Sequence, residues 1–120
     1  MGWIFENDRP IYAQLADQLR LRIVTGEYGP GERIASVREL AAEAGVNPNT
    51  MQRALSELES SGLIYSQRTS GRFVTDDPDR IREARKSTAD KDVRLFLSRM
   101  KALGLSREEI MELLEVYDYE

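Results

Sequence analysis

Two helix signals separated by one tight turn constrain the fold of this chain more than any other feature. The stretch SVRELAAEAG, residues 36–45, opens with a capping box, in which Ser36 and the glutamate three residues later can satisfy each other's backbone amides, and it closes on Gly45, a typical helix terminator. A second helix starts almost at once, with Asn47 as its N-cap and Pro48 in its first turn. Helices joined this closely predict a helix-turn-helix.

The segments on either side of this pair predict a winged helix. Apolar residues at helical spacing predict a helix over residues 10–25, followed by the Gly/Pro loop GEYGPGERIAS. Residues 33–35 can form only a very short strand. After the helix pair, the β-prone runs LIYSQ and RFVT flank RTSG, which predicts a β-hairpin. The expected fold is mostly α, of the α+β class, with a small β-hairpin wing.

The sequence after DDPD has a different organisation. Two further helices are predicted over residues 80–103 and 106–119, separated by Gly104. We therefore expect two domains, a winged helix-turn-helix over residues 1–76 and a helical tail over residues 77–120.

Composition excludes several classes of function. The chain has neither cysteine nor histidine, so disulfides, zinc sites and histidine-based catalysis are not expected. No glycine-rich loop has the spacing of a nucleotide-binding motif and no nucleophile–base pair is recognisable, so we expect no enzyme, no cofactor and no metal. The N-terminus lacks a signal-peptide pattern and no apolar run reaches the roughly 20 residues that span a bilayer, which predicts a cytoplasmic protein without membrane contact.

The start of the second helix of the pair carries the clearest candidate for function. Its short polar side chains lie opposite an apolar face formed by Met51, Leu55 and Leu58. In a helix-turn-helix this end of the second helix enters the DNA major groove, where Asn and Gln can pair with adenine and Arg with guanine. The alternative is that Asn47 is only an N-cap and that the other polar residues are merely solvated. The candidate base-reading residues are Asn47, Asn49, Thr50, Gln52 and Arg53.

The predicted wing and the start of the first helix of the pair supply candidates for contacts with the DNA backbone. A wing with arginine near its tip typically follows phosphates or enters a narrow minor groove, and Gly71 allows close approach of the backbone. Because the net charge is −4, such a surface must come from local placement of charge. The alternatives are a solvated hairpin and a local pair between Arg38 and Glu39 or Glu43. The candidates are Ser36, Arg38, Arg68, Ser70, Gly71 and Arg72.

Residues 9–75 resemble a known family. The features that carry the resemblance are a helix beginning Pro-Ile-Tyr, a G-x-x-x-P-G loop, the stretches SVRELA and VNPNT, and a wing ending in G-x-F-V. Together they resemble the N-terminal domain of the GntR family of bacterial transcription regulators. The short two-helix tail resembles the YtrA-like branch of that family.

The resemblance implies a homodimer and DNA contacts at the family's motif positions. Ala35 departs from the family's usual proline, and Thr69 and Arg72 alter the wing. Pro48 stands where other branches carry a base-reading arginine, so base preference cannot be copied from them. The implied contact positions are Ser36, Arg38, Asn47, Asn49, Thr50, Gln52 and Gly71.

The tail carries an apolar stripe on each of its two predicted helices. Two helices bury little on their own, so the stripes predict packing against another surface. We expect a two-fold dimer that presents two recognition helices to the half-sites of a two-fold symmetric operator, and the alternative is packing within one chain. The expected dimerisation residues are Val93, Phe96, Leu97, Met100, Leu103, Ile110, Leu113, Leu114 and Tyr117.

The combined pattern predicts a sequence-specific DNA-binding transcription regulator, expected to repress by blocking polymerase at a promoter. Its partners would be double-stranded operator DNA and a second copy of the chain. A small-molecule effector stays open, since the tail is too small to enclose a typical pocket within one subunit. The alternative function is a winged-helix protein-interaction module that never touches DNA, which the negative net charge favours slightly.

Overall fold

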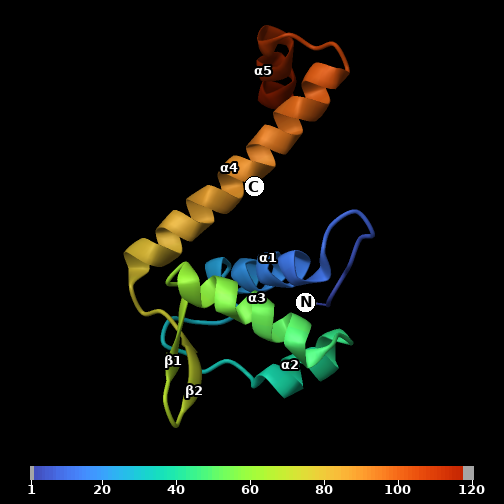
Figure 1. Ribbon diagram of the computed structural model, residues 1–120. Helices are drawn as coiled ribbons and strands as arrows, with labels where there is room; N and C mark the ends of the chain where they lie inside the picture. Colours follow the sequence, from blue (N-terminus) through green and yellow to red (C-terminus); the bar gives the residue numbers. More distant parts are fainter. Residues whose placement is uncertain (1, 118–120) are drawn as a thin grey trace. The chain divides into compact units, whose positions relative to one another are not determined.

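The computed structural model describes residues 2–117 and forms two compact units, one ending at Lys86 and the other beginning at Ser87. The elements of the described residues are, in chain order, α1 (Ile11–Val24), α2 (Val37–Ala44), α3 (Pro48–Ser60), β1 (Ile64–Gln67), β2 (Gly71–Val74), α4 (Pro78–Ala102) and α5 (Arg107–Val116) (Figure 1). The predicted fold class, mostly helical with one β-hairpin, is confirmed. None of these helices combines the length and hydropathy that crossing a membrane requires.

The predicted domain boundary after residue 76 stays a prediction. The chain between β2 and α4 passes through this point, but the first turns of α4 belong to the first compact unit. Ile81, in the first turn of α4, is buried in the core of that unit.

The two caps that frame the helix-turn-helix are formed, although one differs in detail from the prediction. The Ser36 hydroxyl accepts from the Glu39 amide at 3.2 Å and donates to the Glu39 carboxylate at 3.0 Å. The carboxylate therefore bonds to the hydroxyl, and the reciprocal bond to the Ser36 amide that completes a capping box is not formed. Gly45 ends α2 with φ of +72°, a conformation that favours glycine. Asn47 caps α3 by accepting from the Asn49 amide at 2.7 Å.

The core of the first unit lies between α1 and α3, which run side by side in Figure 1. Leu15 and Leu19 of α1 and Met51, Leu55 and Leu58 of α3 are at most 1% exposed and belong to one apolar cluster. Each fully buried side chain of this kind contributes about 1.5–3 kcal/mol of transfer free energy. The predicted apolar face of α3 is thus confirmed, and its burial directs the opposite, polar face to solvent.

The wing is an antiparallel pair of short strands. Its register runs from Ile64 opposite Val74 at the base to Gln67 opposite Gly71 near the tip. Burial decreases from the base of the hairpin to its tip: Ile64 and Val74 at the base are buried, whereas β1 beyond its first residue is exposed. The tip therefore extends away from the core into solvent.

The loop before α2 adds a third row to this hairpin. Arg33 forms a bridge with Phe73, and the Ile34 amide donates to the Arg72 carbonyl at 3.0 Å. This is the very short strand expected over residues 33–35. It connects the wing to the residues that lead directly into α2.

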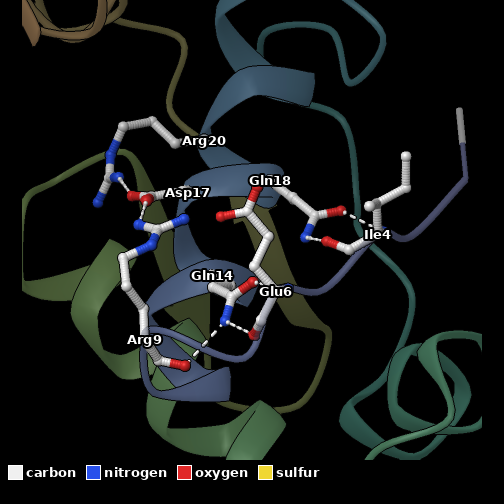
Figure 2. A network of polar contacts seen from close by, with 7 residues as sticks. All are labelled: Ile4, Glu6, Arg9, Gln14, Asp17, Gln18 and Arg20. Carbon is white, nitrogen blue, oxygen red and sulfur yellow. Dashed lines mark hydrogen bonds and ion pairs between the residues drawn. The ribbon is translucent and has the colours of Figure 1, made fainter. Parts of the chain in front are cut away.

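The segment before α1 is held along that helix by two glutamines (Figure 2). The Gln14 side chain, 2% exposed, accepts from the Glu6 amide at 2.7 Å and donates to the Glu6 and Arg9 carbonyls at 2.8 Å each. Gln18, one turn later, donates to the Ile4 carbonyl at 2.7 Å and accepts from the Ile4 amide at 3.2 Å. Side-chain amides thus satisfy backbone groups of a segment that has no regular secondary structure.

The same N-terminal segment is anchored by its tryptophan. The Arg22 guanidinium carbon lies 4.0 Å from the centre of the Trp3 ring and 6.0 Å from that of Tyr28. Arg22 is only 2% exposed, so these cation–π contacts lie largely out of water, where they are strongest.

The second unit is a helical hairpin made by the end of α4 and by α5. The capping box at the start of α5 is complete: Ser106 accepts from the Glu109 amide at 3.2 Å and its own amide donates to the Glu109 carboxylate at 3.0 Å. The bond from the Ser106 amide lowers the pKa of Glu109. The predicted helices are confirmed with small shifts of their ends, and residues 118 and 119 of the second lie outside the described part of the chain.

Candidate nucleic-acid interface

Exposed polar side chains occupy the first turns of α3. Asn49 and Gln52 are exposed, and Thr50 is half-buried beside the fully buried Met51. Asn47 is also exposed, but its side-chain oxygen already accepts from the backbone in the helix cap. The positive end of the helix dipole lies at the same place and favours an approaching phosphate. The structure therefore brings these predicted residues together at one helix end.

Arg53 is held differently from the other predicted base-reading residues. Its guanidinium carbon lies 3.6 Å from the centre of the Tyr12 ring on α1. This cation–π contact holds the side chain against the neighbouring helix. A base contact by Arg53 stays a prediction, and it would require the guanidinium to leave the ring or to reach past it.

A basic hollow of about 550 Å³ lies between the start of α2 and the wing. It brings together residues that are far apart in the sequence, because the loop before α2 pairs with β2. Guanidinium groups next to a hydroxyl match the charge and hydrogen-bonding needs of a DNA phosphate. The arginine and hydroxyl side chains of the lining are Arg33, Ser36, Arg38, Ser66, Arg68, Thr69 and Arg72.

Arg33 is the arginine of this hollow that the sequence did not indicate as a site residue. Its Nε donates to the Ser70 carbonyl at 2.7 Å, across 37 positions of sequence. A Cβ atom added to Gly71 would lie 3.1 Å from the same Nε, so the absence of a side chain at residue 71 leaves room for the Arg33 guanidinium. The predicted wing residues Ser70 and Gly71 therefore contact Arg33 through their main chain. The only signal in the sequence was a basic residue within a very short predicted strand.

Arg72 bridges the wing to α3. Its Nε donates to the Glu59 carboxylate at 2.5 Å, and the same oxygen accepts from the Ser66 hydroxyl at 2.8 Å. The hydrogen bond from Arg72 lowers the pKa of the Glu59 carboxyl. Arg72 is half-buried and lines the hollow, but its guanidinium is engaged within the protein. Direct contact of Arg72 with DNA stays a prediction.

The second unit has an apolar groove of about 660 Å³ between α4 and α5. Phe96, Leu97 and Leu114 line it while being 37%, 44% and 49% exposed. Ile110, another predicted dimerisation residue, is 7% exposed, so its side chain packs mainly inside the hairpin. Met111 is 49% exposed and was not among the predicted residues.

The remaining predicted dimerisation residues divide between the groove and its surroundings. Val93 lines the groove, whereas Met100, Leu103, Leu113 and Tyr117 are not part of its lining. Leu103 and Tyr117 are more than 70% exposed, so they are apolar surface of the same unit.

A recognition helix with a polar tip, a tight glycine turn before it and a basic hairpin wing after it define a winged helix-turn-helix DNA-binding protein. The chain belongs to the gntR family of bacterial regulatory proteins, whose family model matches residues 11–74. It is a DNA-binding transcription regulator of that family, and membership favours this function over the protein-interaction module.

The chain is similar to relatives over the winged helix and, in some, over the tail. It is 39% identical over 108 residues to the uncharacterized HTH-type transcriptional regulator YhcF of Bacillus subtilis, covering 90% of this chain and 89% of that protein. It is 39% identical over 67 residues to the HTH-type transcriptional repressor YtrA of Bacillus subtilis, covering 56% of this chain and 52% of that protein. The predicted resemblance to the GntR family and to YtrA-like members is confirmed.

Solved structures agree with this assignment. A GntR family transcriptional regulator from Listeria monocytogenes superposes with a TM-score of 0.85 at 38% identity, covering 95% of this chain and 100% of that one. The DNA-binding domain of AraR, in complex with operator ORX1, superposes with a TM-score of 0.56 at 31% identity, covering 60% of this chain and 93% of that one.

Proposed function

We propose that this chain is a repressor that binds a two-fold symmetric operator as a homodimer and acts in the cytoplasm. The observation that carries the proposal is the exposure of Asn49 and Gln52 at the start of α3, opposite Met51 and Leu55, which are 0% exposed. A helix held rigidly by one face and polar on the other meets the requirement for reading base edges in the major groove.

Each predicted residue receives a role from its surroundings. Asn49, Thr50 and Gln52 read base edges, joined by the amide group of Asn47 and by Arg53 where it reaches past Tyr12. Ser36, Arg38 and Arg68 hold backbone phosphates from the two sides of the basic hollow. Ser70 and Gly71 bring the main chain of the wing close to the DNA. Arg72 supports the wing through Glu59.

The apolar surface of the second unit supports the homodimer. Half-exposed leucines and a phenylalanine around a groove are unfavourable in water and are typical of an interface. Lys101 and Arg107 line this groove, and the exposed face of α5 carries Glu108, Glu112 and Glu115. A second copy thus offers apolar side chains for the groove and carboxylates for its basic edge.

Repression is supported by the relatives, among which YtrA is named a repressor and AraR is bound to an operator. A dimer on a promoter excludes polymerase by occupying its site. An effector, if one exists, would have to act at the dimer interface or in the open groove of the tail.

Selection of duplexes from a random DNA pool tests the proposal. The full-length chain is expected to recover a site with two-fold symmetry, and its affinity is expected to rise steeply as salt falls, because phosphate contacts release counterions. Recovery of no common sequence, with only weak binding at low salt, would contradict it.

A further inference from the structure

Backbone hydrogen bonds join the base of the wing to the loop before α2. The Gly31 amide donates to the Val74 carbonyl at 3.0 Å, and the Val74 amide donates to the Glu32 carbonyl at 2.9 Å. The Ile34 amide continues the row by donating to the Arg72 carbonyl at 3.0 Å. This row ends before the tip, which begins beyond the last pair of the hairpin register.

At the tip, an arginine side chain from the loop before α2 contacts the main chain of the wing. The Ser70 amide closes the turn locally on the Gln67 carbonyl at 3.1 Å. The Ser70 carbonyl accepts from Nε of Arg33. Arg33 lies between Glu32 and Ile34, two residues of the row, and three positions before Ser36, the N-cap of α2. The backbone bonds join the loop before α2 to the base of the wing, and the Arg33 side chain joins the same loop to the tip.

The local geometry is suited to this contact. Gly71 has φ of +105°, a conformation that strains any residue with a side chain, and an added Cβ would approach Nε of Arg33 to 3.1 Å and Nη2 to 3.3 Å. The Nε and Nη2 edge of the guanidinium therefore faces the place that a side chain at residue 71 would occupy. Arg33 remains exposed and lines the basic hollow together with Arg38 and Arg68.

We propose that Arg33 is a positioning residue for operator binding: it fixes the wing tip relative to the start of α2, so that Arg68 on the wing and Arg38 on α2 grip the DNA backbone together. This inference rests on the proposed function. A flexible tip would have to be ordered at the moment of binding, and fixing it beforehand removes that entropic cost.

The test is a double-mutant cycle on the full-length chain. Arg33→Gln, Arg68→Gln and the double variant are titrated with the duplex that the wild-type protein selects from a random pool, at fixed salt. Arg82→Gln is the matched control, because Arg82 is an exposed arginine of the same unit that lies outside the hollow and pairs with Asp79. This control measures how much DNA affinity is lost when one positive charge is removed from the surface.

Arg33→Gln is expected to weaken binding about tenfold beyond the control, the size of a charge-assisted hydrogen bond. The double variant is expected to have about the same DNA affinity as the single variant that binds more weakly. The reason is that Arg68 already loses its contact with the DNA backbone when the tip is no longer fixed. Arg33→Lys should lose nearly as much DNA affinity as Arg33→Gln, because lysine carries a methylene group at the position where arginine carries Nε. In the free protein, the Ser70 amide should exchange its hydrogen faster in both Arg33 variants.

Four outcomes would overturn the inference while leaving the proposed function intact. They are wild-type affinity in Arg33→Lys, a loss in Arg33→Gln no greater than in the control, additive losses in the double variant, and no loss in Arg68→Gln. Failure of the wild-type protein to select any sequence would instead overturn the proposed function, and the inference with it.

Discussion

Two asparagines at the start of α3, Asn47 and Asn49, lie in different surroundings. The side-chain oxygen of Asn47 is engaged by the Asn49 amide, whereas the Asn49 side chain is exposed. Asn49→Ala should therefore relax base preference at one operator position by about 1–3 kcal/mol without changing binding to unrelated DNA. Titration of the selected duplex and its single-base variants measures this.

Arg68→Ala should act on every duplex alike. Loss of a phosphate contact weakens binding uniformly and lowers the salt slope by about one unit. The same titrations at several salt concentrations measure it, and Ser60→Ala, exposed in the last turn of α3, is the control. If the Asn49 and Arg68 variants lost affinity equally on all sequences, the division between base and backbone contacts would be wrong.

The bridge between Glu59 and Arg72 makes a pH-dependent contribution to stability. Because the folded state lowers the pKa of Glu59, the contribution is complete above its ordinary value of 4.5 and is lost as pH falls through the lower folded value. Glu59→Gln should reduce the free energy of unfolding by about 1 kcal/mol at neutral pH, and by progressively less below about pH 4.5. Urea denaturation of both proteins from neutral to acidic pH checks this, and a pH-independent difference would speak against the bridge.

At the scale of residues, the sequence predicted what is local. The caps at Ser36 and Asn47 involve partners two or three positions away, which sequence spacing can identify. The partners of Arg33 and Arg72 lie 37 and 13 positions away and meet only because the loop, the wing and α3 pack together. No local pattern reveals such pairs.

At the level of elements, the buried side chain of Gln14 makes more of the bonds that hold the segment before α1 than the exposed Gln18 does. Gln14→Leu removes three hydrogen bonds to the Glu6 and Arg9 backbone, so the segment should detach and the free energy of unfolding should fall by about 1–3 kcal/mol. Gln18→Leu is the matched comparison. It should lower the free energy of unfolding by less, because the two bonds that Gln18 makes to Ile4 are exposed. Chemical denaturation and amide exchange at Glu6 measure both; equal effects would argue against a special role of the buried amide.

The helices and the hairpin were predictable because each shows a periodic apolar pattern or a turn signal. The segment before α1 has neither, since its order comes from glutamines on another element that bond to its main chain. The contact between Arg53 and Tyr12 was missed for a similar reason, because it depends on the packing of α1 against α3.

For the whole molecule, operator affinity should depend on association through the tail. Leu97→Glu combined with Leu114→Glu places two carboxylates in the apolar groove and should convert the proposed dimer to a monomer. The monomer should lose the gain that comes from binding two half-sites at once, while its affinity for a single half-site stays unchanged. Sedimentation equilibrium and titration of full and half-site duplexes measure these effects.

Ser98→Glu is the control for the tail, because Ser98 is exposed on α4 and does not line the groove. It should remain dimeric and bind the full site as the wild type does. A wild-type protein that is monomeric at all concentrations, yet binds the full site tightly, would contradict dimerisation through the tail.

The stacking of Trp3 on Arg22 gives the chain a spectroscopic property of its own. Trp3 is the sole indole in the sequence, so all intrinsic fluorescence excited at the red edge of the protein absorption band comes from one place. Detachment of the N-terminal segment would move that fluorophore from a guanidinium-covered site into water. Emission wavelength and quenching by iodide would then follow this single event in real time, without any attached dye.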